Sequence, residues 1–138
     1  MRMQIQAWCA AVGLALLAGS SVVAHHSASA YNLDKSVTLE TTVHEIIFTN
    51  PHVMLHFDAS TPTGEIQHWS IETYNPAVMK RAGWAKTTLK AGDKVTITFH
   101  AAINGTTNGY IRNGDGKIVF NGKQLNLDQT AGNSPGEP

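Results

Sequence analysis

Histidine is the side chain of this sequence with the clearest capacity for chemistry. Seven histidines are present, and two arrangements of them stand out. His25 and His26 are adjacent, and His52, Met54 and His56 alternate along the chain. Imidazole is a common ligand of transition metals; thioether with imidazole suits Cu(I), and amine with imidazole suits Cu(II). The spacing therefore predicts a candidate metal site, with copper as the expected ion.

The role of His25 depends on processing of the chain before it. An arginine near the start precedes an uncharged, leucine-containing run over 7–19, and small residues follow up to Ala24. This is the layout of a cleaved secretory signal peptide, which we predict over residues 1–24, with cleavage after Ala30 as the alternative. The run is too short to span a bilayer, which takes roughly 20 apolar residues. We expect a periplasmic or secreted protein without a membrane span.

Cleavage after Ala24 removes Cys9, the single cysteine of the chain. Without a thiol the mature protein forms no disulfide, no cysteine zinc site and no cysteine nucleophile. Any metal must then be bound by histidine, methionine or carboxylate. As the first residue, His25 offers both its amine and its ring to one ion, and His26 and His52 supply further imidazoles. The alternative for the N-terminal pair is a disordered chain end that binds nothing.

Charge and motifs exclude other classes of function. The chain has 10 basic and 10 acidic residues, and loss of the leader removes one arginine, so the mature protein lacks the positive charge that nucleic-acid binding needs. The common signatures of hydrolases, nucleotide-binding loops and metalloproteases are absent. The carboxylates Glu45, Asp58 and Glu72 are expected to face solvent. We therefore expect a binding protein and no enzyme.

Alternation of apolar and polar residues predicts the strands that carry these histidines. A long strand, with room for a bulge, covers 37–48, and Asn50–Pro51 ends it because proline cannot donate to a strand ladder. A second strand has Val53, Leu55 and Phe57 inward, and a hairpin leads to a third strand around Trp69.

The same alternation places His52, Met54 and His56 on the outer face of the second strand, where His68 of the third can lie beside them. We regard Met54, His56 and His68 as weaker candidate ligands than the N-terminal pair and His52. The alternative for the side chains on this strand face is an ordinary polar outer face. His52 also belongs to an Asn-Pro-His corner, where its ring can bond to the local backbone instead of a ligand.

After the third strand, the sequence changes from the alternation typical of a strand to the signals of a short helix. Asn75 as N-cap, Pro76 as first helical residue and Gly83 as terminator predict a short helix. Trp84 and Leu89 are expected in the core, before a fourth strand with Val95, Ile97 and Phe99 inward. Four Asn-Gly pairs, at 104, 108, 113 and 121, are each able to adopt the positive φ of a tight hairpin between short strands.

This order of elements predicts an all-β fold with one short helix, namely a small OB-fold-like Greek-key β-barrel after the cleaved signal peptide. The barrel domain is predicted over 25–128, and the tail over 129–138 is expected to be disordered. Another small β-sandwich or barrel satisfies the same alternation.

Six motifs occur in order along the chain: Ala24-His25-His26-Ser27, Thr49-Asn50-Pro51-His52, Trp69, Asn75-Pro76, Gly83-Trp84 and Leu89 to Asp93. In these motifs the chain resembles the exported bacterial domain-of-unknown-function family 6152, from His25 to about Leu127. The resemblance implies a secreted or periplasmic β-rich domain and brings no activity with it.

Two functions remain open at this point. The first is an exported binding module that holds a transition metal such as copper through His25, His26 and His52. The second is a metal-free barrel domain that binds a small ligand or a protein partner in the periplasm, with Tyr74 and Trp84 near the groove.

Overall fold

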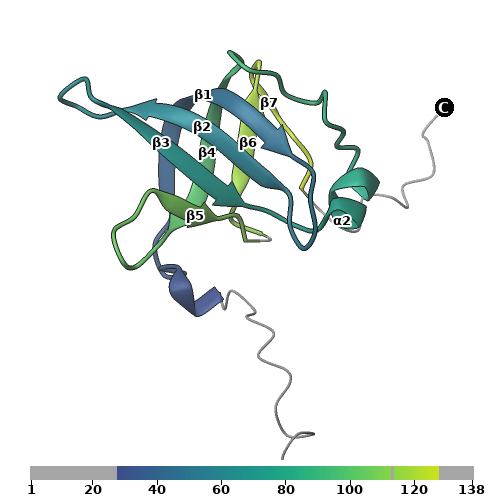
Figure 1. Cartoon of the computed structure of the whole chain (residues 1–138), viewed down its shortest axis with the longest axis horizontal. Helices are drawn as coiled ribbons and strands as arrows, with labels where there is room; N and C mark the ends of the chain where they lie inside the picture. The colour runs from purple at the N-terminus through teal and green to yellow at the C-terminus, as the bar shows by residue number, and fades with distance from the viewer. Residues whose placement is uncertain (1–27, 113, 128–138) are drawn as a thin grey trace, which may run out of the picture.

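The computed structural model describes residues 28–112 and 114–127. The predicted leader, His25, His26 and the C-terminal tail lie outside these residues. The described elements are η1 (Ala28–Ala30), β1 (Val37–Ile47), β2 (Met54–Ser60), β3 (Ile66–Glu72), α2 (Pro76–Arg81), β4 (Lys94–Ala101), β5 (Asn108–Tyr110), β6 (Lys117–Phe120) and β7 (Lys123–Gln124). Figure 1 shows the strands curved around one another as a barrel, with α2 joined by a loop to the end of β3. In the described part of the chain, no helix is long and apolar enough to cross a membrane.

Five strands close into a barrel. The hydrogen-bonded order is β1-β2-β3-β5-β4, and β1 also pairs with β4, so the sheet closes on itself. The β3–β5 pair is parallel, and α2 connects β3 to β4. A closed five-stranded barrel with its helix at this point is an OB-fold. The predicted all-β barrel with one short helix is therefore confirmed.

Strand β1 is long enough to pair with two neighbouring strands. Its first half pairs with β4, from Val37 opposite Phe99 to Thr42 opposite Lys94. Its second half pairs with β2, and the register shifts between Val43 and Glu45. A β-bulge bends a strand at such a shift. The long, bulged strand predicted from the sequence is thus confirmed, with its bulge at His44.

The core follows the predicted register. Leu55 and Phe57 of β2 are about 2% and 1% exposed, and Phe57 meets Phe99 of β4 edge to face at 6.0 Å. Trp84 is 3% exposed, and its indole Nε1–H donates to the carbonyl oxygen of Asn126. The buried cluster consists of Val43, Val53, Leu55, Phe57, Ile71, Met79, Trp84, Leu89, Val95, Ile97, Phe99, Ile111, Ile118 and Leu127.

The short helix begins and ends as predicted. The side chain of Asn75 accepts a hydrogen bond from the backbone N–H of Val78 at 3.0 Å, and Pro76 occupies the first turn. Gly83 has φ of 90° after the last turn. Val78 and Met79 are the buried residues of α2, which attaches the helix to the barrel.

The Asn-Gly pairs have different roles. Asn121 and Gly122 both have positive φ, of 52° and 74°, between β6 and β7, as predicted. The prediction of a turn at 108 is wrong, because Asn108 and Gly109 lie inside β5. A Cβ atom at Gly109 would collide with the side chains of Phe99 and Ile71. Glycine is therefore needed here because β5 lies close to the core, and not because the chain turns.

Candidate functional site

A groove at one end of the barrel brings His52 and Met54 together. His52 lies two residues before β2, Met54 is the first residue of β2, and Glu72 is the last residue of β3. Met54 and Glu72 are direct partners in the antiparallel ladder. The groove has a volume of about 460 Å³. Its lining residues are Ala30, Tyr31, Thr49, Pro51, His52, Met54, Glu72, Ala102, Asn104, Thr106 and Asn108.

The ring of His52 is held by Glu72. Its Nδ1 lies 2.5 Å from Oε1 of Glu72, with the imidazole side chain 38% exposed and the carboxylate 11% exposed. A proton on Nδ1 would face this carboxylate, which leaves Nε2 as the ring nitrogen open to a ligand. Carboxylates orient metal-binding histidines in this way. The alternative of a ring bonded to the local backbone is not the arrangement observed.

Glu72 corrects one prediction from the sequence. We expected this carboxylate to face solvent, but the residue is buried at 8% exposure. Its second oxygen, Oε2, accepts a hydrogen bond from the hydroxyl of Tyr31 at 3.2 Å. Tyr31 is 41 positions away in the chain, so strand alternation contains no sign of this contact.

The segment before β1 is fixed against the rim of the groove. The N–H of Asn32 donates to the carbonyl of Ala101 at 2.9 Å, and the N–H of Ile103 donates to the carbonyl of Ala30 at 3.0 Å. The ring of Tyr31 stacks on Tyr110 at 5.4 Å. Burial, followed by the charge and hydrogen bond of Glu72, raises the pKa of Tyr31 to about 12.

Tyr110 shares this environment. Burial and the charge of Glu72 raise its pKa as well, with a smaller opposing effect from Arg112. Both tyrosines therefore stay neutral over the ordinary range of pH and present hydroxyl groups, not charges, beside Glu72.

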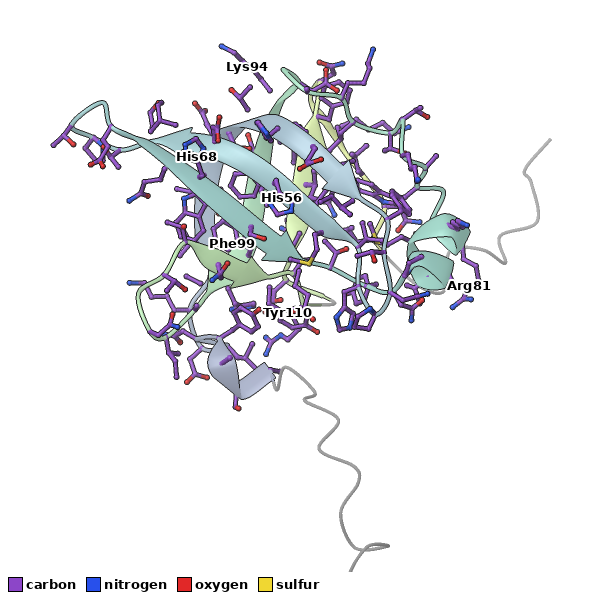
Figure 2. The ribbon with its side chains drawn as sticks, viewed as in Figure 1. His56, His68, Arg81, Lys94, Phe99 and Tyr110 are labelled. Carbon is purple, nitrogen blue, oxygen red and sulfur yellow. The ribbon has the colours of Figure 1, made fainter. Side chains whose placement is uncertain are left out.

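The two remaining weaker candidates, His56 and His68, line a different pocket. Figure 2 shows both on the outward face of β2 and β3. This second pocket, of about 420 Å³, also contains His44 of the β1 bulge and Asp58. Nδ1 of His68 lies 2.5 Å from Oδ1 of Asp58. The structure thus separates His52 and Met54 from His56 and His68.

Neither pocket holds a complete metal site by itself. Over residues 28–112 and 114–127, no three side chains of the types His, Cys, Asp and Glu group closely enough to hold a metal ion. A metal at His52 therefore needs ligands of another type or from another part of the chain. Met54 meets the first condition, and His25 and His26, outside the described residues, meet the second.

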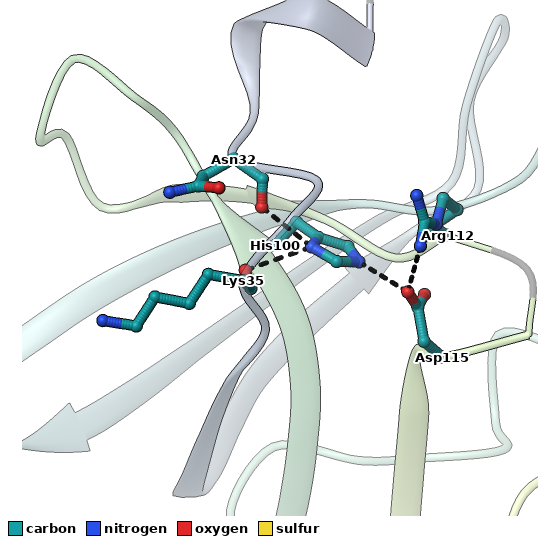
Figure 3. Close-up of polar contacts among 5 residues, drawn as sticks. All are labelled: Asn32, Lys35, His100, Arg112 and Asp115. Carbon is teal, nitrogen blue, oxygen red and sulfur yellow. Dashed lines mark hydrogen bonds and ion pairs between the residues drawn. The ribbon is translucent and has the colours of Figure 1, made fainter.

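Sequence reasoning missed the buried histidine His100. It is 2% exposed, and its Nδ1 lies 2.9 Å from the carbonyl oxygen of Asn32 and 3.1 Å from that of Lys35. Its Nε2 lies 3.1 Å from Oδ2 of Asp115, which Arg112 contacts at 2.5 Å (Figure 3). This contact network links the segment before β1 to β4 and to the turn before β6.

Asp115 and Arg112 each stabilise the charged form of the other. Burial opposes ionisation of Asp115, but the hydrogen bond from Arg112 and the interaction with the His100 ring outweigh it and lower the pKa of the carboxyl group. The hydrogen bond to Asp115 in turn raises the pKa of Arg112. No local pattern indicates this network, because its members lie on three separate segments.

The aromatic residues expected near a ligand groove are placed differently. Trp84 is buried and bonded to Asn126, so it is unable to present a surface to a ligand. Tyr74 is partly buried and packs against the core. A ligand in the groove of His52 would meet Tyr31 instead.

The fold places the protein in the class of small OB-fold β-barrels. Its chain belongs to the family of unknown function DUF6152, whose family model matches residues 13–112. No curated protein and no solved structure matches the chain. The resemblance seen in the sequence motifs is therefore confirmed, and the family description assigns no activity.

Proposed function

We propose that the protein is an exported binding module that holds a copper ion in the groove of His52, for buffering or delivery of the metal in the periplasm. The observation that carries this proposal is the His52–Glu72 pair. Glu72 engages Nδ1 at 2.5 Å, which fixes the ring and leaves Nε2 as the coordinating nitrogen. An exposed histidine without such a partner would lose more rotamer freedom on binding a metal.

The described residues that follow the N-terminal histidines lie at the groove of His52. Ala30 and Tyr31 line the same groove as His52, and His26 is four residues before Ala30. Four residues of extended chain span at most about 14 Å. With cleavage after Ala24, the amine and ring of His25 and the ring of His52 provide three nitrogen ligands, a set that suits Cu(II). His26 is the candidate fourth ligand.

Thermal unfolding with and without Cu(II) tests this proposal on protein that begins at His25. A ligand that binds only the folded state adds about 2.7 kcal/mol at one hundred times its dissociation constant. We expect copper to stabilise the wild type and the control His56→Ala, whose imidazole lies in the other pocket. His52→Ala should lose most of the stabilisation. A wild-type protein that copper does not stabilise would contradict the proposal.

A second candidate function rests on the size and lining of the groove. Its volume of about 460 Å³ falls in the range of small-molecule sites, and Pro51, Met54 and Ala102 give it apolar surface. A metal-free module would bind a small ligand or a protein partner here. Native mass spectrometry of protein purified from its own compartment separates the candidates, because the second predicts a bound organic molecule or protein in place of copper.

A further inference from the structure

Asn104 and Gly105 form an Asn-Gly pair in the exposed loop between β4 and β5. The side-chain oxygen Oδ1 of Asn104 accepts two hydrogen bonds from Thr106, one from the backbone N–H at 3.1 Å and one from the hydroxyl at 2.8 Å. Asn104 and Thr106 also line the groove of His52. Two donors therefore polarise the Cγ carbonyl of a side chain at the edge of this groove.

An asparagine followed by glycine has a nucleophile beside its own side chain. The backbone nitrogen of the glycine, once its proton is lost, is able to attack Cγ of the asparagine and to close a succinimide ring. The nitrogen–Cγ bond forms, the Cγ–Nδ2 bond breaks, and the amide nitrogen takes up one proton and leaves as ammonia. Water then opens the ring at either carbonyl carbon and leaves aspartate or isoaspartate. Negative charge develops on Oδ1 during the attack, and hydrogen-bond donors aimed at such an oxygen stabilise the intermediate.

We propose that Asn104 is a site of spontaneous succinimide formation and that Thr106 activates it. The nucleophile is the backbone nitrogen of Gly105, whose N–H makes a long hydrogen bond of 3.3 Å to the carbonyl oxygen of Ala102. Glycine has no Cβ atom to obstruct the attack. Water is the only other reactant. The product is a new carboxylate at the edge of the groove, and the inference does not depend on a copper site.

The other two Asn-Gly pairs that the structure describes in full are held more firmly. Asn108 and Gly109 lie within β5, and the backbone at Gly109 is so close to the core that a Cβ atom would collide with core side chains. Asn121 occupies the turn that the β6–β7 ladder closes. Ring closure requires rotation of the backbone toward Cγ, and ladder pairing resists that rotation. Asn104 is therefore expected to react first of these three.

Peptide mapping by mass spectrometry tests the inference on folded protein that is incubated at mildly alkaline pH. We expect Asn104 to convert at least about fivefold faster than Asn108 and Asn121, because these two react only after local opening of a ladder. In urea all three pairs should convert at similar rates, which separates the effect of the fold from that of the Asn-Gly motif. Isoaspartate should accompany aspartate, since only the ring yields both. If Asn121 converts as fast as Asn104 in the folded protein, or if aspartate forms without isoaspartate, the proposal is wrong.

Thr106→Val tests the activation, because valine keeps the branched shape of threonine and removes the hydroxyl donor. We expect conversion of Asn104 to slow about two- to tenfold, the effect of one ordinary hydrogen bond. Thr106→Ser restores the donor and should restore the rate. Thr107→Val is the matched control, because both described hydrogen bonds to Asn104 come from Thr106. Circular dichroism confirms that each variant is folded. An unchanged rate in Thr106→Val would overturn the role of Thr106.

Discussion

Nδ1 of His52 lies 2.5 Å from Oε1 of Glu72, and this contact joins the turn before β2 to the end of β3. The other oxygen of Glu72 accepts a hydrogen bond from the hydroxyl of Tyr31, so the segment before β1 also contacts this carboxylate. The orientation of the His52 ring thus depends on a buried residue that does not itself have to touch a ligand.

Glu72→Gln should weaken copper binding by about 10- to 100-fold, the usual effect of removing the partner of a metal-binding histidine. The amide keeps the shape of the side chain but loses the charge that holds Nδ1. Glu45→Gln, on the exposed face of β1, is the control and should bind as the wild type does. Equal Cu(II) affinities for both variants in a chelator competition would show that Glu72 does not position the ring.

Leu55→Ala should lower the free energy of unfolding by about 2 to 5 kcal/mol, because the side chain is buried and its removal leaves a cavity. His56→Ala, the next residue on the outer face, should stay within about 0.5 kcal/mol of the wild type. Urea denaturation of both variants gives the comparison. A larger loss for His56→Ala than for Leu55→Ala would mean that the register of β2 is shifted by one residue.

Much of the fold is readable in the sequence because its signals are local. Alternation along 53–58 and 95–99 gives the correct inward faces, and Asn75 with Gly83 gives the correct helix. Two features were not predicted from the sequence, because they depend on contacts between segments that are distant in the chain. Buried Glu72 bonds to Tyr31, which is 41 positions away, and a side chain at Gly109 would collide with Phe99 and Ile71.

The candidate site was predictable only in part, for the same reason. The sequence places His52 and Met54 on one face of a strand, and both line the groove. Alternation also places His56 on that face, but the groove ends before it, and His56 joins His44 and His68 in another pocket. The burial of His100 depends on the carbonyl groups of Asn32 and Lys35, which no spacing reveals.

Tyr31 should be the source of a late step in the spectroscopic titration of the three tyrosines. Its pKa is raised from 10.0 to about 12, so an unfolded chain releases this proton first. The resulting contribution to stability is complete below about pH 10 and disappears as the pH rises toward 12. Tyrosinate absorbance of the wild type and Tyr31→Phe measures the step. If the step at high pH remained unchanged in Tyr31→Phe, it would come from another tyrosine and the prediction would be wrong.

Asp115 should contribute to the acid sensitivity of the protein. Its pKa is lowered from 3.8 in the folded state, so an unfolded chain binds this proton first. The contribution to stability is present above about pH 4 and is lost as the pH falls through the lowered pKa. Asp115→Asn should therefore lose less stability than the wild type between about pH 5 and about pH 2. Parallel acid denaturation curves for the wild type and Asp115→Asn would contradict this role. Glu40→Gln, at an exposed position of β1, serves as the control.

The Cu(II) affinity of three proteins, measured by chelator competition, tests the copper site most directly: the chain that begins at His25, the same chain with one extra N-terminal residue, and His52→Ala. The site uses the amine of His25, so the extra residue should weaken binding at least about tenfold, and His52→Ala should weaken it similarly by removal of Nε2. Equal affinity of all three proteins would contradict the account and reduce copper binding to incidental chelation at the surface.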